Sequence, residues 1–278
     1  MTYRTLMVGL DASPTRFART DLAIALARDF GAHLIGVAPT GLVDLPAAPE
    51  AAAMLGDDAA TAWELLIEQA QSAAAEFHER CKAARLRSFE ALVDRAPHAP
   101  SFITHAQCTD LLVMSQPDPA HSGHRQDRAV LEQVLMHSAR PTLVVPYVQR
   151  GLLGMDRMLV GWNESREAVR AMTEALPLLR RAGEVSLSHW HHGGEAVRVR
   201  QHMHGLRQWL AFQGVDVEEQ ISPTTAPFGE AMLSAACDGT IDLIVVGAYG
   251  HPRWMEDLFG GTSRTLLDAM TVPVLMAH

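Results

Sequence analysis

Hydrophobic and polar positions divide the chain into short apolar runs of strand length and longer segments with helical spacing, in regular alternation. In the first half the apolar runs predict strands at residues 3–10, 33–38, 87–93, 110–115 and 142–145. The segments between them predict helices at residues 15–30, 61–85, 100–107 and 127–138. This alternation predicts a parallel sheet with helices on both faces.

The second half repeats the pattern. The run that begins at Val160 matches the run that begins at Val8, and Ser13 and Ser165 are each predicted to cap the helix that follows. Further strands are predicted at residues 185–190, 215–221, 241–246 and 273–278, with helices at 165–182, 195–212, 227–237 and from 260 onward. The two halves therefore carry the same β/α unit.

The ends of the two halves also align without a gap. Asp110 and Asp242 open matching apolar runs, and Pro141 and Pro273 follow them at the same distance. The chain is thus predicted to be an internal duplication with two Rossmann-like α/β domains, at residues 1–148 and 155–278. Each domain is expected to contain a five-stranded parallel sheet with helices on both faces, and to bind ligands at the carboxyl ends of its strands.

A glycine-rich loop follows the predicted strand 241–246. Gly247 and Gly250 come directly after this strand, and Gly260 and Gly261 precede a helix that is predicted to start near Thr262. Glycines let the backbone approach an anion closely, and the unpaired N–H groups of a first helical turn point toward it. The loop is therefore predicted to bind phosphate.

The spacing of the loop glycines, G-x2-G-x9-G, resembles the ATP-binding loop of the universal stress protein family. The resemblance covers essentially the whole chain and matches the tandem layout of the family's two-domain members. It implies two adenine nucleotide alpha hydrolase-like domains and an ATP or AMP site in the second. The residues that it assigns to this site in the loop are Gly247, Gly250, His251, Gly260, Gly261 and Thr262.

Two departures from the family's pattern affect the expected site. Gly261 replaces the family's Ser or Thr after the third glycine, and Thr262 stands one place later. In the first domain Ser115, Asp118 and Arg128 occupy the glycine positions. No phosphate binding is expected in that first domain.

The resemblance also assigns two residues to the nucleoside. Asn163 occupies the place of an Asp that contacts the nucleoside in the family, although it is equally suited to capping a helix together with Ser165. Trp190 aligns with a residue that lines the adenine pocket. Its indole either stacks on the base or fills the pocket, and the sequence leaves both alternatives open.

Other candidate chemistry is weaker. His251 and Arg253 are placed to contact phosphates, whereas Glu256 and Asp257 oppose them, so Mg²⁺ or Mn²⁺ is expected only if ATP is bound. The histidines at residues 189–204 lack the spacing of zinc sites, and no metal site is predicted. No catalytic residues are predicted either. His251 is the only loop histidine that would serve as a base for ATP hydrolysis, and a single histidine is weak support for catalysis.

Composition narrows the function classes. A net charge of −9, with acidic and basic residues interspersed, argues against a nucleic-acid surface and a membrane anchor. The N-terminus lacks a signal-peptide pattern, so a cytoplasmic protein is expected. Cys81, Cys108 and Cys237 form no C-x-x-C pair, which favours reduced thiols. Lys82 is the only lysine and precedes Ala83, which excludes a lysine-dependent P-loop.

The sequence therefore predicts a stress-response factor that binds an adenine nucleotide in its second domain and acts by regulation or partner binding, without turnover. One alternative is a dimeric scaffold that binds no nucleotide, and another is a slow ATPase. The resemblance implies that the edges of the fifth strands, at 142–145 and 273–277, pair across domains or subunits. A homodimer formed through these edges is expected.

Overall fold

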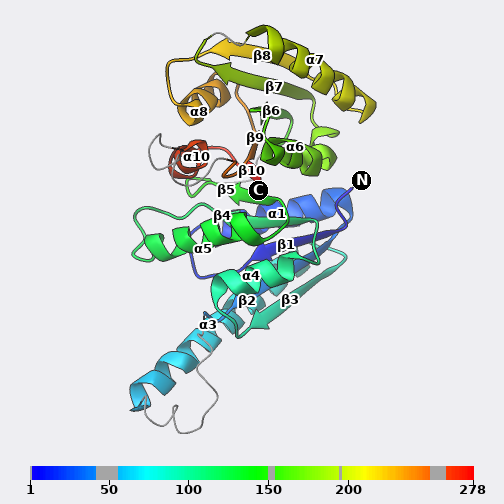
Figure 1. Ribbon diagram of the computed structural model, residues 1–278. Helices are drawn as coiled ribbons and strands as arrows, with labels where there is room; N and C mark the ends of the chain where they lie inside the picture. The colour runs from blue at the N-terminus through cyan, green and yellow to red at the C-terminus, as the bar shows by residue number, and fades with distance from the viewer. Residues whose placement is uncertain (1, 42–55, 150–153, 194–195, 251–260) are drawn as a thin grey trace. The chain divides into compact units, whose positions relative to one another are not determined.

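The computed structural model describes residues 2–41, 56–149, 154–193, 196–250 and 261–278 (Figure 1). These residues form two compact units, called here the N-terminal unit, Tyr3–Arg140, and the C-terminal unit, Pro141–His278. Strands and helices alternate through both units, which confirms the predicted α/β class and its Rossmann-like order.

The described part of the N-terminal unit contains a parallel sheet in the order β3-β2-β1-β4. Gly36 packs against Phe77, whereas Gly9, which pairs with the next residue Val37, packs against Phe102. Neighbouring strand residues point to opposite faces, so the helices that carry these two phenylalanines cover opposite faces of the sheet. The elements are β1 (Thr5–Gly9), α1 (Arg16–Phe30), β2 (His33–Pro39), α3 (Gly56–Ala83), β3 (Phe89–Asp94), α4 (His98–Ala106), β4 (Leu111–Ser115) and α5 (His124–His137).

The described part of the C-terminal unit has strands in the order β5-β10-β9-β6-β7-β8. Gly161 faces Met232 and Val246, and Gly247, the residue after Val246, faces the start of the helix at Glu167. Two helices, α6 and α8, therefore lie on opposite faces. The elements are β5 (Thr142–Val145), β6 (Arg157–Gly161), α6 (Arg166–Leu179), β7 (Glu184–His191), α7 (Ala196–Phe212), β8 (Glu218–Pro223), α8 (Phe228–Asp238), β9 (Leu243–Gly247), α10 (Thr262–Ala269) and β10 (Val274–Ala277).

The two strand-five segments pair with each other inside one chain. β5 and β10 are antiparallel, with Val144 opposite Val274 and Leu143 opposite Leu275. β5 therefore groups with the C-terminal unit, which begins at Pro141. The expected domain bounds, 1–148 and 155–278, stay predictions. β10 pairs with β9 along its other side, so β10 offers no free edge to a second copy. Assembly into a homodimer stays a prediction.

Equivalent hydrogen bonds show the duplication in three dimensions. The carboxylate of Asp110 accepts a hydrogen bond from the backbone N–H of Thr5 at 2.9 Å, and the carboxylate of Asp242 accepts one from Arg157 at 2.9 Å. Thr5 and Arg157 are the first residues of β1 and β6. Each half thus ties its first strand to the start of its fourth in the same way.

The two helices that follow these first strands begin differently. The Ser165 hydroxyl accepts a hydrogen bond from the backbone N–H of Ala168 at 3.1 Å, which confirms the predicted cap of α6. The predicted cap at Ser13 is wrong, because α1 begins at Arg16 with Thr15 as its N-cap residue and no side-chain cap. The backbone N–H of Ser13 instead donates to the carboxylate of Asp11 at 2.9 Å.

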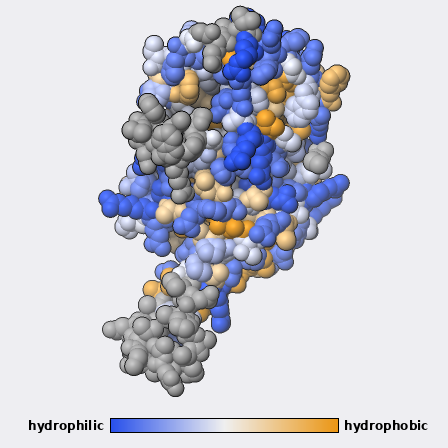
Figure 2. Space-filling view, viewed as in Figure 1, coloured by the Kyte–Doolittle hydropathy of each residue, from blue (hydrophilic) through white to orange (hydrophobic). Residues whose placement is uncertain are grey.

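Most of the surface seen in Figure 2 is hydrophilic. Among the described residues, the most exposed large apolar side chain is Phe212, 87% exposed, at the end of α7 that leads toward β8. It is therefore at the edge of the sheet opposite the carboxyl ends of the strands. No described helix combines the length and the hydropathy that a membrane span requires.

Candidate functional site

The candidate site begins where β9 ends against a helix start. A β-carbon added at Gly247 would lie 2.6 Å from the backbone nitrogen of Ala168 and 2.6 Å from the carbonyl carbon of Glu167. Such a distance is too short for any side chain, so the strand packs directly on the first turn of α6. Packing by itself is a sufficient reason for glycine at this position.

Gly250 lies beside the same helix start. Its added β-carbon would be 3.4 Å from the hydroxyl oxygen of Ser165 and 2.9 Å from Oε2 of Glu167. Before it, the backbone N–H of Tyr249 donates to the hydroxyl of Ser263 at 3.0 Å, in the first turn of α10. The loop after β9 therefore touches the N-terminal turns of two helices, and N-terminal turns favour anions.

Glu167 is a site residue that the sequence reasoning missed. Its side chain is 3% exposed, and its carboxylate accepts a hydrogen bond from the guanidinium of Arg166. Burial raises the pKa of Glu167, but the hydrogen bond and charge of Arg166 outweigh it and lower the pKa below its usual value. An ionised carboxylate therefore faces Gly250, where a phosphate would approach. An acidic residue in a first helical turn is common, so the sequence alone gave no signal of this contact.

Asn163 supports the start of α6. Its side-chain oxygen accepts hydrogen bonds from the backbone N–H of Ser165 at 3.2 Å and from the Ser165 hydroxyl at 2.7 Å. The capping interpretation of Asn163 is therefore visible in the structure. The side chain is also exposed, and its contact with a nucleoside stays a prediction.

Glu164 has a strained backbone that α7 holds in place. Its φ is 61°, in the left-handed region that non-glycine residues rarely adopt. The carboxylate of Glu164 lies 2.8 Å from Nη2 of Arg198 and 2.5 Å from Nδ1 of His202. Burial raises the pKa of Glu164, and the bonds from His202 and Arg198 outweigh burial and lower it. These contacts fix the loop that carries Asn163.

The start of α10 contains two further predicted residues. Gly261 is the N-cap residue, with φ −53° and ψ 140°, a backbone conformation open to any residue. Thr262 is the first helical residue. Their roles in phosphate binding stay predictions, and the predicted site residues His251 and Gly260 lie outside the described residues.

Trp190 lies on the face of the sheet opposite the start of α6, the face on which α10 packs against α8. Ser188 pairs with Gly161, which faces α8, so Trp190, two residues beyond Ser188, also faces α8. Gly247 faces α6 on the opposite side. The structure thus brings Asn163, Gly247 and Gly250 to the start of α6 and places Trp190 beside α8. The contact of Trp190 with adenine stays a prediction.

The histidines after β7 make local contacts. Nδ1 of His189 is 2.9 Å from the backbone oxygen of Trp162, and Nδ1 of His192 is 2.9 Å from that of Thr224. His192 also stacks on Phe228, with ring centroids 4.6 Å apart. Among the described residues no three histidine, cysteine, aspartate or glutamate side chains are grouped to hold a metal ion.

The corresponding place in the N-terminal unit is closed by an ion pair. Arg19 is 1% exposed, and its Nη1 donates to the carboxylate of Asp11 at 2.9 Å and to the hydroxyl of Ser115 at 3.1 Å. Burial raises the pKa of Asp11, but the charge of Arg19 and hydrogen bonds from Arg19 and Ser13 lower it to about 2. Ser115, which takes the position of Gly247, is therefore engaged with a buried side chain.

Further acidic charge surrounds this ion pair. Burial and the charge of Asp11 raise the pKa of Asp127, whereas His121, 3.5 Å away, and His98 oppose the rise. Burial lowers the pKa of His98, against the charges of both aspartates. The expectation of no phosphate site in this unit stays a prediction.

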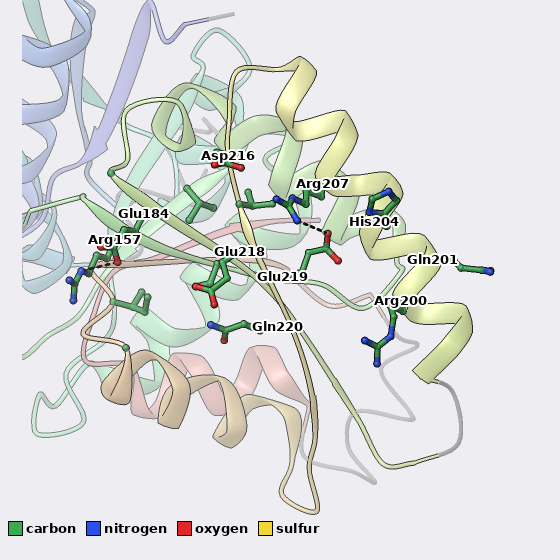
Figure 3. Close-up of a pocket in the computed structure, with 16 residues that line it drawn as sticks. Arg157, Glu184, Arg200, Gln201, His204, Arg207, Asp216, Glu218, Glu219 and Gln220 are labelled. Carbon is green, nitrogen blue, oxygen red and sulfur yellow. Dashed lines mark ion pairs between the residues drawn. The ribbon is translucent and has the colours of Figure 1, made fainter.

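A wide cavity of about 1230 Å³ lies elsewhere in the C-terminal unit (Figure 3). Arg157 and Glu184 pair across it at 3.2 Å, and Arg207 pairs with Glu219 at 3.9 Å. Arg157, Glu184 and Glu218 are the first residues of their strands, so the cavity lies at the edge opposite the carboxyl ends. Its volume alone does not make it a ligand site, and two of its three arginines are paired with glutamates that also line it.

The chain was compared with known protein families, curated proteins and solved structures. No protein-family model matches the chain, and no curated protein does. Among solved structures, a universal stress protein from Archaeoglobus fulgidus DSM 4304 is similar over 98% of this chain and 95% of that chain, at 18% identity and a TM-score of 0.73. A functionally unknown protein from Pseudomonas aeruginosa PAO1 is similar over 99% of this chain and 92% of that chain, at 13% identity and a TM-score of 0.60.

A third structure, from Pseudomonas aeruginosa UCBPP-PA14 and assigned to the universal stress proteins, is similar over 99% of this chain and 93% of that chain, at 14% identity and a TM-score of 0.59. The chain therefore has the tandem α/β fold of full-length universal stress proteins, and the resemblance inferred from the sequence is confirmed at the level of fold. What these folds bind is decided by the residues of each site.

Proposed function

We propose that the chain acts as a tandem universal stress protein whose C-terminal unit binds an adenine nucleotide, ATP or AMP, as a regulatory ligand. The observation that carries this proposal is the position of the loop after β9. Gly250 lies within contact distance of the start of α6, and Tyr249 is bonded to the start of α10. Two helix N-termini and a glycine backbone converge at the carboxyl ends of the strands, where this class of sheet binds ligands.

The proposed site relies on backbone donors. One helix terminus contributes about 0.3–1 kcal/mol to anion binding, so several N–H groups must act together. Gly261 and Thr262 supply the first N–H groups of α10, and Asn163 is the proposed contact for the nucleoside. Its amide adds a donor to the acceptor that already holds Ser165.

Glu167 decides which form of nucleotide suits the site. Its buried carboxylate faces Gly250 and repels a bare phosphate. A divalent cation prefers carboxylate and phosphate oxygens, so Mg²⁺ or Mn²⁺ held between Glu167 and the phosphates would replace repulsion by attraction. We therefore propose that metal-bound ATP is favoured over AMP without metal.

Isothermal titration calorimetry with AMP and with ATP, each with and without Mg²⁺, tests the proposal. Saturable binding of at least one nucleotide is expected, and Gly250→Asp abolishes it because the new carboxylate would meet Glu167. The control Asp118→Gly changes the equivalent position of the N-terminal unit and leaves binding unchanged. Absence of saturable binding at millimolar nucleotide, or full affinity in Gly250→Asp, would overturn the proposed site.

Asn163→Asp separates the two roles of Asn163. The aspartate keeps the acceptor that the Ser165 hydroxyl and N–H require, so the cap of α6 is retained. A change in affinity for AMP without a change for pyrophosphate assigns residue 163 to the nucleoside. Equal changes for both ligands, or none, would restrict Asn163 to the cap.

One observation favours a second candidate function, a scaffold that binds no nucleotide. A carboxylate lies near the loop after the fourth strand of each half, although at positions that do not align: Glu167 at Gly250, and Asp11, which shares Nη1 of Arg19 with Ser115. Size-exclusion chromatography with light scattering, performed with and without ATP, distinguishes the two. A homodimer that forms without nucleotide and is indifferent to it favours the scaffold, and ATP-dependent assembly favours the regulatory binder.

We also propose that nucleotide turnover is not the main activity and that the protein works in the cytoplasm. His251, the one candidate base for ATP hydrolysis, lies outside the described residues. Phosphate release from ATP that exceeds the buffer blank and is lost in His251→Ala would contradict the non-enzymatic proposal.

A further inference from the structure

A second cavity lies on the α8 face of the C-terminal unit. Its volume is about 460 Å³, within the range of small-molecule sites. Trp190 forms one side, near the end of β7, and a flank of α8 forms the other. It lies on the opposite face of the sheet from the start of α6 that Gly247 contacts.

The wall that faces the indole is built from small side chains. Ala231, Ser234 and Ala235 are three and four residues apart on α8, so they share one side of the helix. Trp190 is half-buried, and these small residues leave open space beside it. The cavity can therefore admit a ligand group against an aromatic side chain.

The charges around this cavity have one sign. Glu230 and Asp238 line it, and no arginine, lysine or histidine is among the residues that do. Both carboxylates are exposed, and neither is in an ion pair within the described part of the chain. An unpaired negative charge at each end of the α8 flank and an aromatic side chain opposite are complementary to a positively charged organic group.

We propose that this cavity binds an organic ammonium compound, with the cationic group against the indole of Trp190 and the carboxylates of Glu230 and Asp238, about 12 Å apart along α8, at the two ends of the cavity. The indole supplies a cation–π contact, which is strongest for tryptophan. The two carboxylates supply charge pairing at the rim. The same features exclude a free nucleotide phosphate, so this inference goes beyond the proposed function and does not depend on it.

The test uses choline as the cation and 3,3-dimethyl-1-butanol as its neutral analogue of the same shape. Calorimetry is expected to show saturable binding of choline and at least about tenfold weaker binding of the alcohol, since only the cation gains the cation–π and charge contacts. Equal binding of both compounds would identify a merely apolar cavity. Absence of saturable choline binding would overturn the proposal directly.

Variants locate the site. Trp190→Leu is expected to weaken choline binding about tenfold, and Trp190→Phe, which keeps an aromatic ring, to retain most of it. Glu230→Gln combined with Asp238→Asn is expected to cost about tenfold or more. Glu218→Gln is the matched charge control, because Glu218 is exposed on β8 and does not line the cavity. An equal loss in Glu218→Gln would mean general charge attraction and overturn the site.

Two further measurements keep the result independent of folding and of the glycine loop. Circular dichroism melting of each variant shows whether Trp190→Leu is folded, and Ala235→Leu, which only fills the cavity, provides a second way to remove binding. Saturating AMP is expected to leave choline binding in place. Displacement of choline by AMP would assign Trp190 to the nucleotide site and overturn a separate ammonium site.

Discussion

Arg19 and Asp11 form an ion pair in the N-terminal unit, with Nη1 of Arg19 2.9 Å from the carboxylate of Asp11, the arginine side chain 1% exposed and the aspartate side chain 35% exposed. At the aligned positions the C-terminal unit has Asn163 and Ala171. A long charged side chain thus stands in one unit where the other has a buried alanine. In the N-terminal unit the residue near the end of β1, Asp11, is therefore held by a side chain of the same unit.

This ion pair predicts a stability difference. Asp11→Asn leaves the Arg19 charge buried without its partner, so the free energy of unfolding is expected to fall by about 3 kcal/mol. Asp21→Asn is the matched control, since Asp21 pairs with Arg80 at 2.6 Å where both side chains are partly exposed. It is expected to cost less than about 1 kcal/mol in urea unfolding. Equal losses in the two variants would contradict the buried ion pair.

The same pair predicts a dependence on pH. The pKa of Asp11 falls from 3.8 to about 2 on folding, so the folded state binds fewer protons there than the unfolded state. The stabilising contribution is present above about pH 4 and is lost as the pH falls toward 2. Urea unfolding between about pH 5 and 2 is expected to show wild type and Asp11→Asn converging. A constant difference over this range would contradict the lowered pKa.

The order of strands and helices could be predicted from local sequence patterns, because each strand is a short apolar run and each helix has apolar residues at helical spacing. The pairing of β5 with β10 was expected from the family resemblance and not from local pattern, since an apolar run such as 142–145 carries no sign of which strand will lie beside it. Arg19 was missed. A charged residue within a helical pattern is normally exposed, and only the aspartate at the end of β1 explains its burial.

The candidate site was predicted in part for similar reasons. The glycines and the start of α10 are readable because their spacing is local. The face of the sheet on which Trp190 lies is not readable, because the register of β7 on β6 differs by one residue from that of β2 on β1. The backbone N–H of Leu10 donates to the oxygen of Val37, whereas the N–H of Trp162, at the position aligned with Leu10, donates to the oxygen of Ser188, one residue earlier than the position aligned with Val37. Glu167 was missed since a first-turn acid gives no sign of whether it points to solvent or to the glycine loop.

Gly247 predicts a second stability effect. Gly247→Ala places a methyl group 2.6 Å from the backbone of α6, so the unfolding free energy is expected to fall by about 2 kcal/mol. Gly205→Ala is the control: nothing lies within 4 Å of its added β-carbon, and alanine in that helix is expected to gain about 0.5–1 kcal/mol. Unchanged stability in Gly247→Ala would show that the glycine is not required for packing.

The three cysteines predict a thiol count. Burial raises the pKa of the Cys81 thiol to about 12, against a smaller opposing effect of Arg80, whereas Cys108 and Cys237 are exposed. Because only thiolates react, dithiobis(nitrobenzoate) is expected to modify two thiols in the native protein and the third after unfolding. Fast reaction in the Cys108→Ser/Cys237→Ser variant would contradict the burial of Cys81.

Glu167 gives the sharpest test of the candidate nucleotide site. Its carboxylate faces Gly250, so Glu167→Gln removes a negative charge without changing the size of the side chain. AMP binding without metal is then expected to become about tenfold tighter, and the gain from Mg²⁺ in ATP binding is expected to disappear. Calorimetry of both nucleotides with and without Mg²⁺ measures the two effects separately.

The matched control for this test is Glu184→Gln, which removes the same charge at the opposite edge of the sheet. It is expected to change neither affinity by more than about twofold, because exposed charges at a distance are screened. Binding that appears only in Glu167→Gln would show that the carboxylate closes an otherwise intact phosphate site. Identical behaviour of the two variants would remove Glu167 from the site, and with it the reason to expect a preference for metal-bound ATP.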